Sequence, residues 1–172
     1  MNRNLWRTFA DAEIGLLKTG EHAPEFTARL SNGETVRLSD YRGKQAIVLS
    51  FYPKDFSQGC TRQACSYRDS YELVRELGAV ILAVSTDGEE QHARFMSSFN
   101  LPYPLISDPE QKLCTLFGAT RFGFSFLPTK RVTYVIDKEG IIRLVSHHEI
   151  TIERHIEDIL ETLHDLQRSG GM

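Results

Sequence analysis

Cysteine is scarce in this 172-residue chain, which has three, at positions 60, 65 and 114. An odd number of cysteines, in a chain without a secretory signal, argues against a framework of structural disulfides. The three also lack the Cys-x-x-Cys spacing that is typical of zinc sites. In a reducing compartment, such cysteines either pack in the core or carry out redox chemistry.

The chain also lacks a long apolar run and a strong net charge. No stretch of about 18 apolar residues is present, so no segment is predicted to span a bilayer. The formal net charge of −3 and the pI of about 6.1 favour neither nucleic acid nor an anionic membrane as a partner. Asp11 and Glu13 interrupt the stretch that would form a signal-peptide core. We therefore expect a cytoplasmic protein.

The composition is that of an ordinary globular protein. Hydrophobic residues make up 41% of the chain and charged residues 25%, which argues against disorder. We divide the chain into an N-terminal extension, residues 1–19, and a single domain, residues 20–168. Leu5, Trp6 and Phe9 fall at helical spacing in the extension, so we expect a short amphipathic helix there.

Hydrophobic periodicity predicts the secondary structure of the domain. We expect strands at residues 26–30, 35–38, 46–51, 79–84, 105–106, 132–136 and 141–145, and helices at residues 61–77, 89–99, 108–117 and from 151 onward. The first strands and helices alternate, which requires parallel crossovers, whereas the last strand pair is an antiparallel hairpin. The sequence therefore predicts an α/β protein with a thioredoxin-like fold, in which helices flank a central mixed β-sheet.

The stretch from residue 51 to residue 65 contains the residues that are most informative about chemistry. Cys60 lies at the expected start of a helix, just beyond the carboxyl end of a central strand, where sites in α/β sheets gather. The free N–H groups at a helix start favour the thiolate, which is the nucleophilic form of cysteine. Pro53 has no N–H to donate and limits water near the thiol. Ser57 offers a hydroxyl to the sulfur and to an incoming peroxide oxygen.

This stretch resembles the peroxiredoxin active-site motif P-x-x-x-[TS]-x-x-C, in which Pro53, Ser57 and Cys60 occupy the defined positions. It is most similar to the bacterioferritin comigratory protein branch, also called peroxiredoxin Q. The resemblance covers residues 20–165 of the chain. Its further motifs are Gly20-x-x-Ala23-Pro24-x-Phe26, Ala83-Val84-Ser85-x-Asp87, Pro104-Leu105-Ile106-Ser107-Asp108, Phe117-Gly118 and Arg131-x-Thr133-x-Val135-Ile136-Asp137-x-x-Gly140.

The resemblance implies a thiol-dependent peroxidase that reduces hydrogen peroxide and organic hydroperoxides without a cofactor. Cys60 would be the peroxidatic cysteine and Cys65 the resolving one, and thioredoxin or a similar dithiol would reduce their disulfide. Pro53, Ser57 and Arg131 would line the pocket. The permanent charge of Arg131 would favour the thiolate and stabilise the departing oxygen. The family also implies a monomer or a homodimer.

Three positions differ from the common pattern of this branch. Ser57 replaces the usual Thr and keeps the hydroxyl. Gln58 replaces a frequent Pro, and Gln63 replaces a frequent Glu, which removes a carboxylate.

Other interpretations of the same residues remain at this stage. A thioredoxin-type disulfide oxidoreductase would need Cys-x-x-Cys, whereas the spacing here is Cys-x-x-x-x-Cys. A redox sensor that passes oxidation to a partner would use the same two cysteines, so the sequence leaves it open. Cys114 is expected to pack in an apolar helix, although some relatives resolve from a later helix. Three histidines, His147, His148 and His155, lack the companion ligands of a metal site, so we expect none.

Overall fold

The computed structural model describes residues 15–121 and 126–170 of the chain. Its centre is a five-stranded sheet in the order β5-β4-β3-β6-β7. Strands β3, β4 and β5 run parallel to one another, and β6 and β7 are each antiparallel to their neighbours. The predicted mixed sheet is therefore confirmed. The strands are β3 (Ala46–Phe51), β4 (Ala79–Ser85), β5 (Leu105–Ser107), β6 (Val132–Ile136) and β7 (Ile142–His147).

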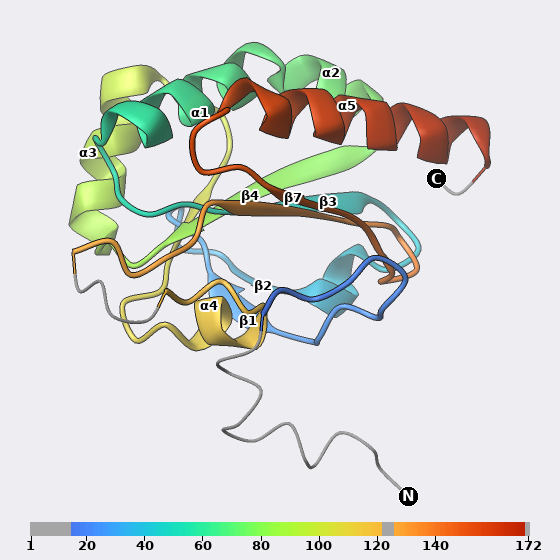
Figure 1. Cartoon of the computed structure of the whole chain (residues 1–172), viewed down its shortest axis with the longest axis horizontal. Coiled ribbons are helices and arrows are strands. Elements are labelled where there is room, and N and C mark those ends of the chain that lie inside the picture. Colours follow the sequence, from blue (N-terminus) through green and yellow to red (C-terminus); the bar gives the residue numbers. More distant parts are fainter. Residues whose placement is uncertain (1–14, 122–125, 171–172) are drawn as a thin grey trace, which may run out of the picture.

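Layers of other elements cover both faces of the sheet (Figure 1). Helices α1, α2 and α5 lie over one face, and the hairpin β1–β2 and helix α4 lie over the other. Helix α3 packs its buried Phe95 into the same core as α1 and α5. These elements are α1 (Gln58–Asp69), α2 (Tyr71–Glu76), α3 (Glu89–Phe99), α4 (Lys112–Leu116), α5 (Glu153–Arg168), β1 (Thr27–Arg29) and β2 (Thr35–Arg37), with a short 3-10 helix, η2 (Leu38–Tyr41).

The nearly continuous apolar run in β3 reflects burial on both faces of the strand. Ile47 and Leu49 point into the core beneath the hairpin and α4, and Val48 points into the core beneath the helices. Successive side chains of a strand alternate between faces, so a strand covered on both sides is mostly apolar. Each such buried side chain contributes about 1.5–3 kcal/mol relative to an exposed one. Strand β3 therefore anchors the segment that follows it.

The helix predicted at residues 61–77 is in fact two helices. α1 begins earlier, at Gln58, and ends at Asp69, and α2 begins at Tyr71. Ser70 between them leaves the helical region with φ −101° and ψ 4°. The predicted single helix was wrong because the apolar pattern continues through Ser70 while the chain changes direction there.

The helix predicted at residues 108–117 is shorter than expected. α4 begins at Lys112, since Gln111 adopts a left-handed conformation with φ 56° that separates it from the preceding turn. The carboxylate of Asp108 still serves the helix start, because it accepts hydrogen bonds from the backbone N–H groups of Leu113 and Cys114. Asp108 therefore caps the helix from a turn away.

The helix predicted in the N-terminal extension falls largely on residues 1–14, outside the described residues. Residues 15–18 form no helix, and Leu16 and Leu17 pack instead against the core beneath α4. No helix in the described ranges is both long and apolar enough to cross a membrane.

Candidate active site

Cys60 lies in the first turn of α1, directly after the segment that leaves β3. Ser57 is the N-cap of this helix. Its hydroxyl accepts a hydrogen bond from the Cys60 backbone N–H at 3.4 Å and donates one to the Lys54 carbonyl at 3.0 Å. Cys60 is 2% exposed. The sulfur is therefore nearly closed off from solvent and lies near the positive end of the helix dipole.

Arg131 reaches the sulfur from the neighbouring strand. β3 and β6 are antiparallel, and Phe51 pairs with Val132, so Arg131 lies beside the start of the segment that carries Pro53. Its Nη1 is 3.3 Å from the Sγ of Cys60 and 2.8 Å from the Oε1 of Gln63. Arg131 is only 6% exposed, so little water screens its charge. The predicted juxtaposition of Arg131 and Cys60 is thus present.

Gly59 makes the close approach of Arg131 possible. A Cβ atom at this position would lie 2.9 Å from Nη2 of Arg131 and 3.6 Å from Cδ1 of Ile152. Any larger residue would therefore push against the guanidinium. The sequence motif contains Gly59, but this contact depends on a strand that lies some seventy residues further along the chain.

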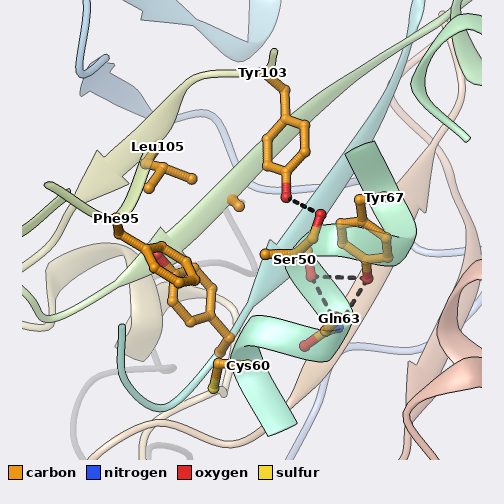
Figure 2. Close-up of a pocket in the computed structure, with 10 residues that line it drawn as sticks. Ser50, Cys60, Gln63, Tyr67, Phe95, Tyr103 and Leu105 are labelled. Carbon is orange, nitrogen blue, oxygen red and sulfur yellow. Dashed lines mark hydrogen bonds between the residues drawn. The ribbon is translucent and has the colours of Figure 1, made fainter. Parts of the chain in front are cut away.

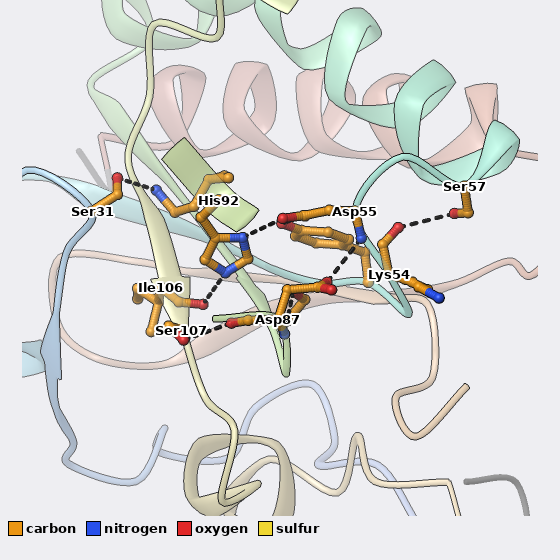
Figure 3. A network of polar contacts seen from close by, with 11 residues as sticks. Ser31, Lys54, Asp55, Ser57, Asp87, His92, Ile106 and Ser107 are labelled. Atoms are coloured by element: carbon orange, nitrogen blue, oxygen red, sulfur yellow. Dashed lines mark hydrogen bonds and ion pairs between the residues drawn. The ribbon is translucent and has the colours of Figure 1, made fainter. Parts of the chain in front are cut away.

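A buried polar network holds the loop between β3 and α1 (Figure 3). Asp55 accepts a hydrogen bond from the Tyr52 hydroxyl at 2.6 Å, and its other oxygen lies 2.6 Å from Nδ1 of His92 on α3. The backbone N–H of Asp55 donates to Asp87 at 2.8 Å. Burial, followed by the charge of Asp55, raises the pKa of Tyr52 well above its usual value, so the hydroxyl stays protonated and donates. The loop that carries Pro53 and Ser57 is thereby fixed to α3 and to the segment that follows β4.

A small cavity of about 10 Å³ lies behind Cys60 (Figure 2). Its walls include Tyr52, Phe95 and Leu105, together with the polar groups of Ser50 and Gln63. A space of this size holds at most one water molecule. The cavity therefore has no room for an organic hydroperoxide.

Cys65 shares helix α1 with Cys60 but has a different environment. Cys60 is buried, whereas Cys65 is partly exposed, and both are free thiols. Five residues along an ideal helix place the two Cα atoms about 8.7 Å apart, with the side chains rotated by about 140° from one another. A disulfide needs Cα atoms within about 7 Å and side chains that face each other. The helix must therefore open before these cysteines can bond.

Comparison with known proteins identifies the family. Residues 19–145 match the model of the AhpC/TSA family. The chain belongs to the AhpC/TSA family. Peroxiredoxin Bcp of Bacillus subtilis (strain 168) is 43% identical over 155 residues, which are 87% of this chain and 97% of that protein. The chloroplastic peroxiredoxin Q of Suaeda salsa is 36% identical over 160 residues, which are 93% of this chain and 74% of that protein.

Solved structures of peroxiredoxins share the fold. Peroxidoxin BcpB from Mycobacterium tuberculosis superposes with a TM-score of 0.80 at 32% identity, covering 87% of this chain and 98% of its own. A peroxiredoxin Q from Xanthomonas campestris gives a TM-score of 0.74 at 26% identity, covering 81% and 90%. The predicted thioredoxin-like fold and the resemblance to the Bcp and peroxiredoxin Q branch are confirmed. This peroxiredoxin is accordingly a thiol-dependent peroxidase.

The remaining predicted pocket residues of this peroxiredoxin lie close to Cys60 along the chain. Pro53 is buried in the loop after β3. The hydrogen bonds that the Ser57 hydroxyl makes are to backbone groups of Lys54 and Cys60. Its contact with sulfur or peroxide oxygen stays a prediction. Within the described residues, no three His, Cys, Asp or Glu side chains gather as they would around a metal ion.

The third cysteine of this peroxiredoxin packs in the core beneath the hairpin. Cys114 has no exposed surface, and its sulfur lies 3.8 Å from the hydroxyl of Thr129. Burial and then the negative charge of Asp108 raise the pKa of its thiol strongly, which disfavours a thiolate. Cys60, in contrast, lies beside a cation.

We therefore expect Cys114→Ser to keep turnover within about twofold of the wild-type rate, because the substitution removes an unreactive thiol. The measurement is steady-state peroxide consumption with a dithiol reductant, alongside peptide mapping of the oxidised protein. A Cys60–Cys114 bridge in that map would show that Cys114, and not Cys65, resolves the oxidised Cys60.

Two sets of residues around the site were not found from sequence. One is the Asp55–His92 pair, and the other is Gln63 with the hydroxyl groups behind it. His92 falls on the inner face of a predicted helix, where its burial could have been expected, but its partner lies 37 residues away. No local pattern specifies such a contact.

Proposed function

We propose that this peroxiredoxin reduces hydroperoxides at Cys60 and forms a Cys60–Cys65 disulfide that thioredoxin or a similar dithiol reduces. The Cys60 thiolate attacks one peroxide oxygen, an S–O bond forms and the O–O bond breaks. The departing oxygen leaves as water or an alcohol after taking a proton, and Cys60 becomes a sulfenic acid. The Cys65 thiolate then attacks that sulfur, the S–S bond forms and the S–O bond breaks, and the hydroxide that leaves takes up a proton to become water. Because an external dithiol must restore the thiols after each cycle, we place the protein in the reducing cytoplasm.

The observation that carries this proposal is the 3.3 Å contact between Nη1 of Arg131 and the sulfur of Cys60. A fixed guanidinium favours the thiolate before the reaction and stabilises the oxygen charge that develops during it. Nε of Arg131 is buried and finds no hydrogen-bond partner among the described residues. A buried donor without a partner is costly, so a peroxide oxygen bound there would satisfy it.

Peroxide consumption coupled to thioredoxin and its reductase tests the proposal. We expect catalytic turnover with hydrogen peroxide and with an organic hydroperoxide. If peroxide oxidises the protein but thioredoxin does not restore its thiols, the proposed reductant is wrong while the peroxidatic step stands. A lack of reaction with either peroxide would contradict both.

Disulfide formation should unwind part of α1. The Gln63–Tyr67 hydrogen bond and the bond from the Tyr103 hydroxyl to the Ala64 carbonyl hold this segment in the reduced protein. Because the two cysteines cannot meet in an intact helix, the oxidised protein must lose these contacts. We expect faster backbone hydrogen exchange across residues 57–68 in the oxidised protein than in the reduced one. Equal and strong protection in both states, with the disulfide verified by mass spectrometry, would refute the unwinding.

A further inference from the structure

A chain of buried hydrogen bonds leads away from Arg131 into the protein. Nη1 of Arg131 donates to Oε1 of Gln63 at 2.8 Å, and Nε2 of Gln63 donates to the Tyr67 hydroxyl at 2.9 Å. Figure 2 shows Gln63 and Tyr67 on consecutive turns of α1, meeting at Ser50 of β3. Gln63 is 2% and Tyr67 1% exposed, so water does not compete for these bonds.

The series of hydrogen bonds continues through β6 to α5. The Tyr67 hydroxyl lies 2.9 Å from Oγ1 of Thr133, which lies 3.1 Å from Nδ1 of His155. Nε2 of His155 lies 2.9 Å from the backbone carbonyl of His148. Thr133 and His155 have no exposed surface. A residue of the C-terminal helix is thus joined to Arg131 through three intermediate side chains.

The groups at the two ends of this series of hydrogen bonds fix the direction in which its donors point. Arg131 can only donate, so Gln63 must present its oxygen to Arg131 and its nitrogen to Tyr67. At the other end, the His148 carbonyl can only accept, so Nε2 of His155 carries a proton. Burial, the largest cause, together with the charges of His148 and Arg131, outweighs the opposing effects of the His148 carbonyl and Asp158 and lowers the pKa of His155 to about 4.

The His155 ring is therefore neutral at pH 7, and its Nδ1 is a bare acceptor. Thr133 must donate its single hydroxyl proton to His155, so toward Ser50 and Tyr67 it can only accept. The proton of Tyr67 then points toward Thr133 or Ser50, which leaves its oxygen free to accept from Gln63. Every donor points from Arg131 toward His155. Bonds aligned in this way strengthen one another.

We propose that His155 is a positioning residue for the peroxidatic site, because as the terminal acceptor it aligns the bonds that hold Gln63 on Arg131 and Arg131 on Cys60. The inference rests on the proposed role of Arg131 beside Cys60. It assigns a role to a buried histidine on α5 that does not line the cavity beside Cys60. It also explains how a neutral Gln63, in place of a carboxylate, holds the guanidinium of Arg131 without neutralising its positive charge.

The test measures alkylation of Cys60 by iodoacetamide as a function of pH, in full-length protein that carries Cys65→Ser and Cys114→Ser. This readout needs neither peroxide nor thioredoxin, so it is independent of whether the proposed peroxidase cycle is correct. We expect His155→Leu to slow alkylation at pH 7 about threefold to tenfold, and to move the midpoint of the pH profile upward. The isosteric Thr133→Val should act in the same direction. His155→Gln, whose amide both accepts and donates, should restore the rate.

A second background separates positioning from a general structural role. If His155 acts through Arg131, His155→Leu should have no further effect on alkylation in a protein that also carries Arg131→Met. A loss of the same size in both backgrounds would overturn the proposal, and so would unchanged alkylation in both His155→Leu and Thr133→Val. The unfolding midpoint of each variant in urea verifies that it is folded at the conditions of the assay.

Discussion

We expect Cys60→Ser to lower peroxide consumption by more than about 10³-fold, because it removes the atom that forms the S–O bond. The serine hydroxyl is close in size to the thiol, so the buried position and the cap by Ser57 should persist. A hydroxyl is not ionised at neutral pH, and the charge of Arg131 is too weak to make it a nucleophile there. The measurement is the rate of peroxide loss on mixing with reduced protein.

The matched control for this experiment is Cys65→Ser. That variant should consume one equivalent of peroxide at the wild-type rate and then stop, since sulfenic acid forms but no internal disulfide follows. Turnover of the Cys60→Ser variant near the wild-type rate would place the peroxidatic cysteine elsewhere. Rapid turnover of Cys65→Ser with thioredoxin would show instead that Cys65 is dispensable for resolution.

Replacing Arg131 should have the second largest effect. Arg131→Met keeps much of the buried side chain but removes the cation 3.3 Å from the sulfur. Loss of one preorganised donor to a developing oxygen charge slows enzymes about 10²- to 10³-fold, and we expect a decrease of about 10²-fold in the reaction with peroxide. The midpoint of the pH profile for Cys60 alkylation should also move upward, because a cation favours the thiolate.

Arg62→Met controls for the loss of any positive charge near the active-site cysteine. Arg62 lies two residues from Cys60 but points outward, pairing with Glu153, and its side chain is 55% exposed. An exposed cation is screened by water, so this variant should react within about twofold of the wild type. Equal losses in the two variants would mean that Arg131 acts through the general charge of the surface and not through its contact with sulfur.

Much of the fold followed from local pattern. Strands β3, β4 and β6 were predicted to within one residue at each end, because strands buried on both faces are mostly apolar. Helix α3 was predicted at its observed bounds. The break at Ser70 and the short α4 were not, since both depend on backbone conformations that the apolar pattern does not encode.

In the candidate site, too, the residues of a local motif were predicted and the residues placed by tertiary contacts were not. Pro53, Ser57 and Cys60 are adjacent in sequence, so a motif locates them, and Arg131 followed from a resemblance in the strand that pairs with β3. The motif does not include the partners that hold these residues in place. His92 and His155 lie on helices without a motif around them, and their roles arise from contacts that only the folded chain creates. Buried polar networks depend on tertiary placement, which residue spacing does not specify.

Peptide mapping after a single oxidation tests the central claim most directly. Reduced protein is mixed with one equivalent of hydrogen peroxide, alkylated, and digested with trypsin, which cleaves after Lys54, Arg62 and Arg68. Cys60 and Cys65 then lie on separate peptides, residues 55–62 and 63–68. We expect the peroxide to be consumed and these two peptides to be joined by a disulfide, with Cys114 still reduced. Peroxide consumption that leaves Cys60 unmodified would contradict its role as the peroxidatic cysteine.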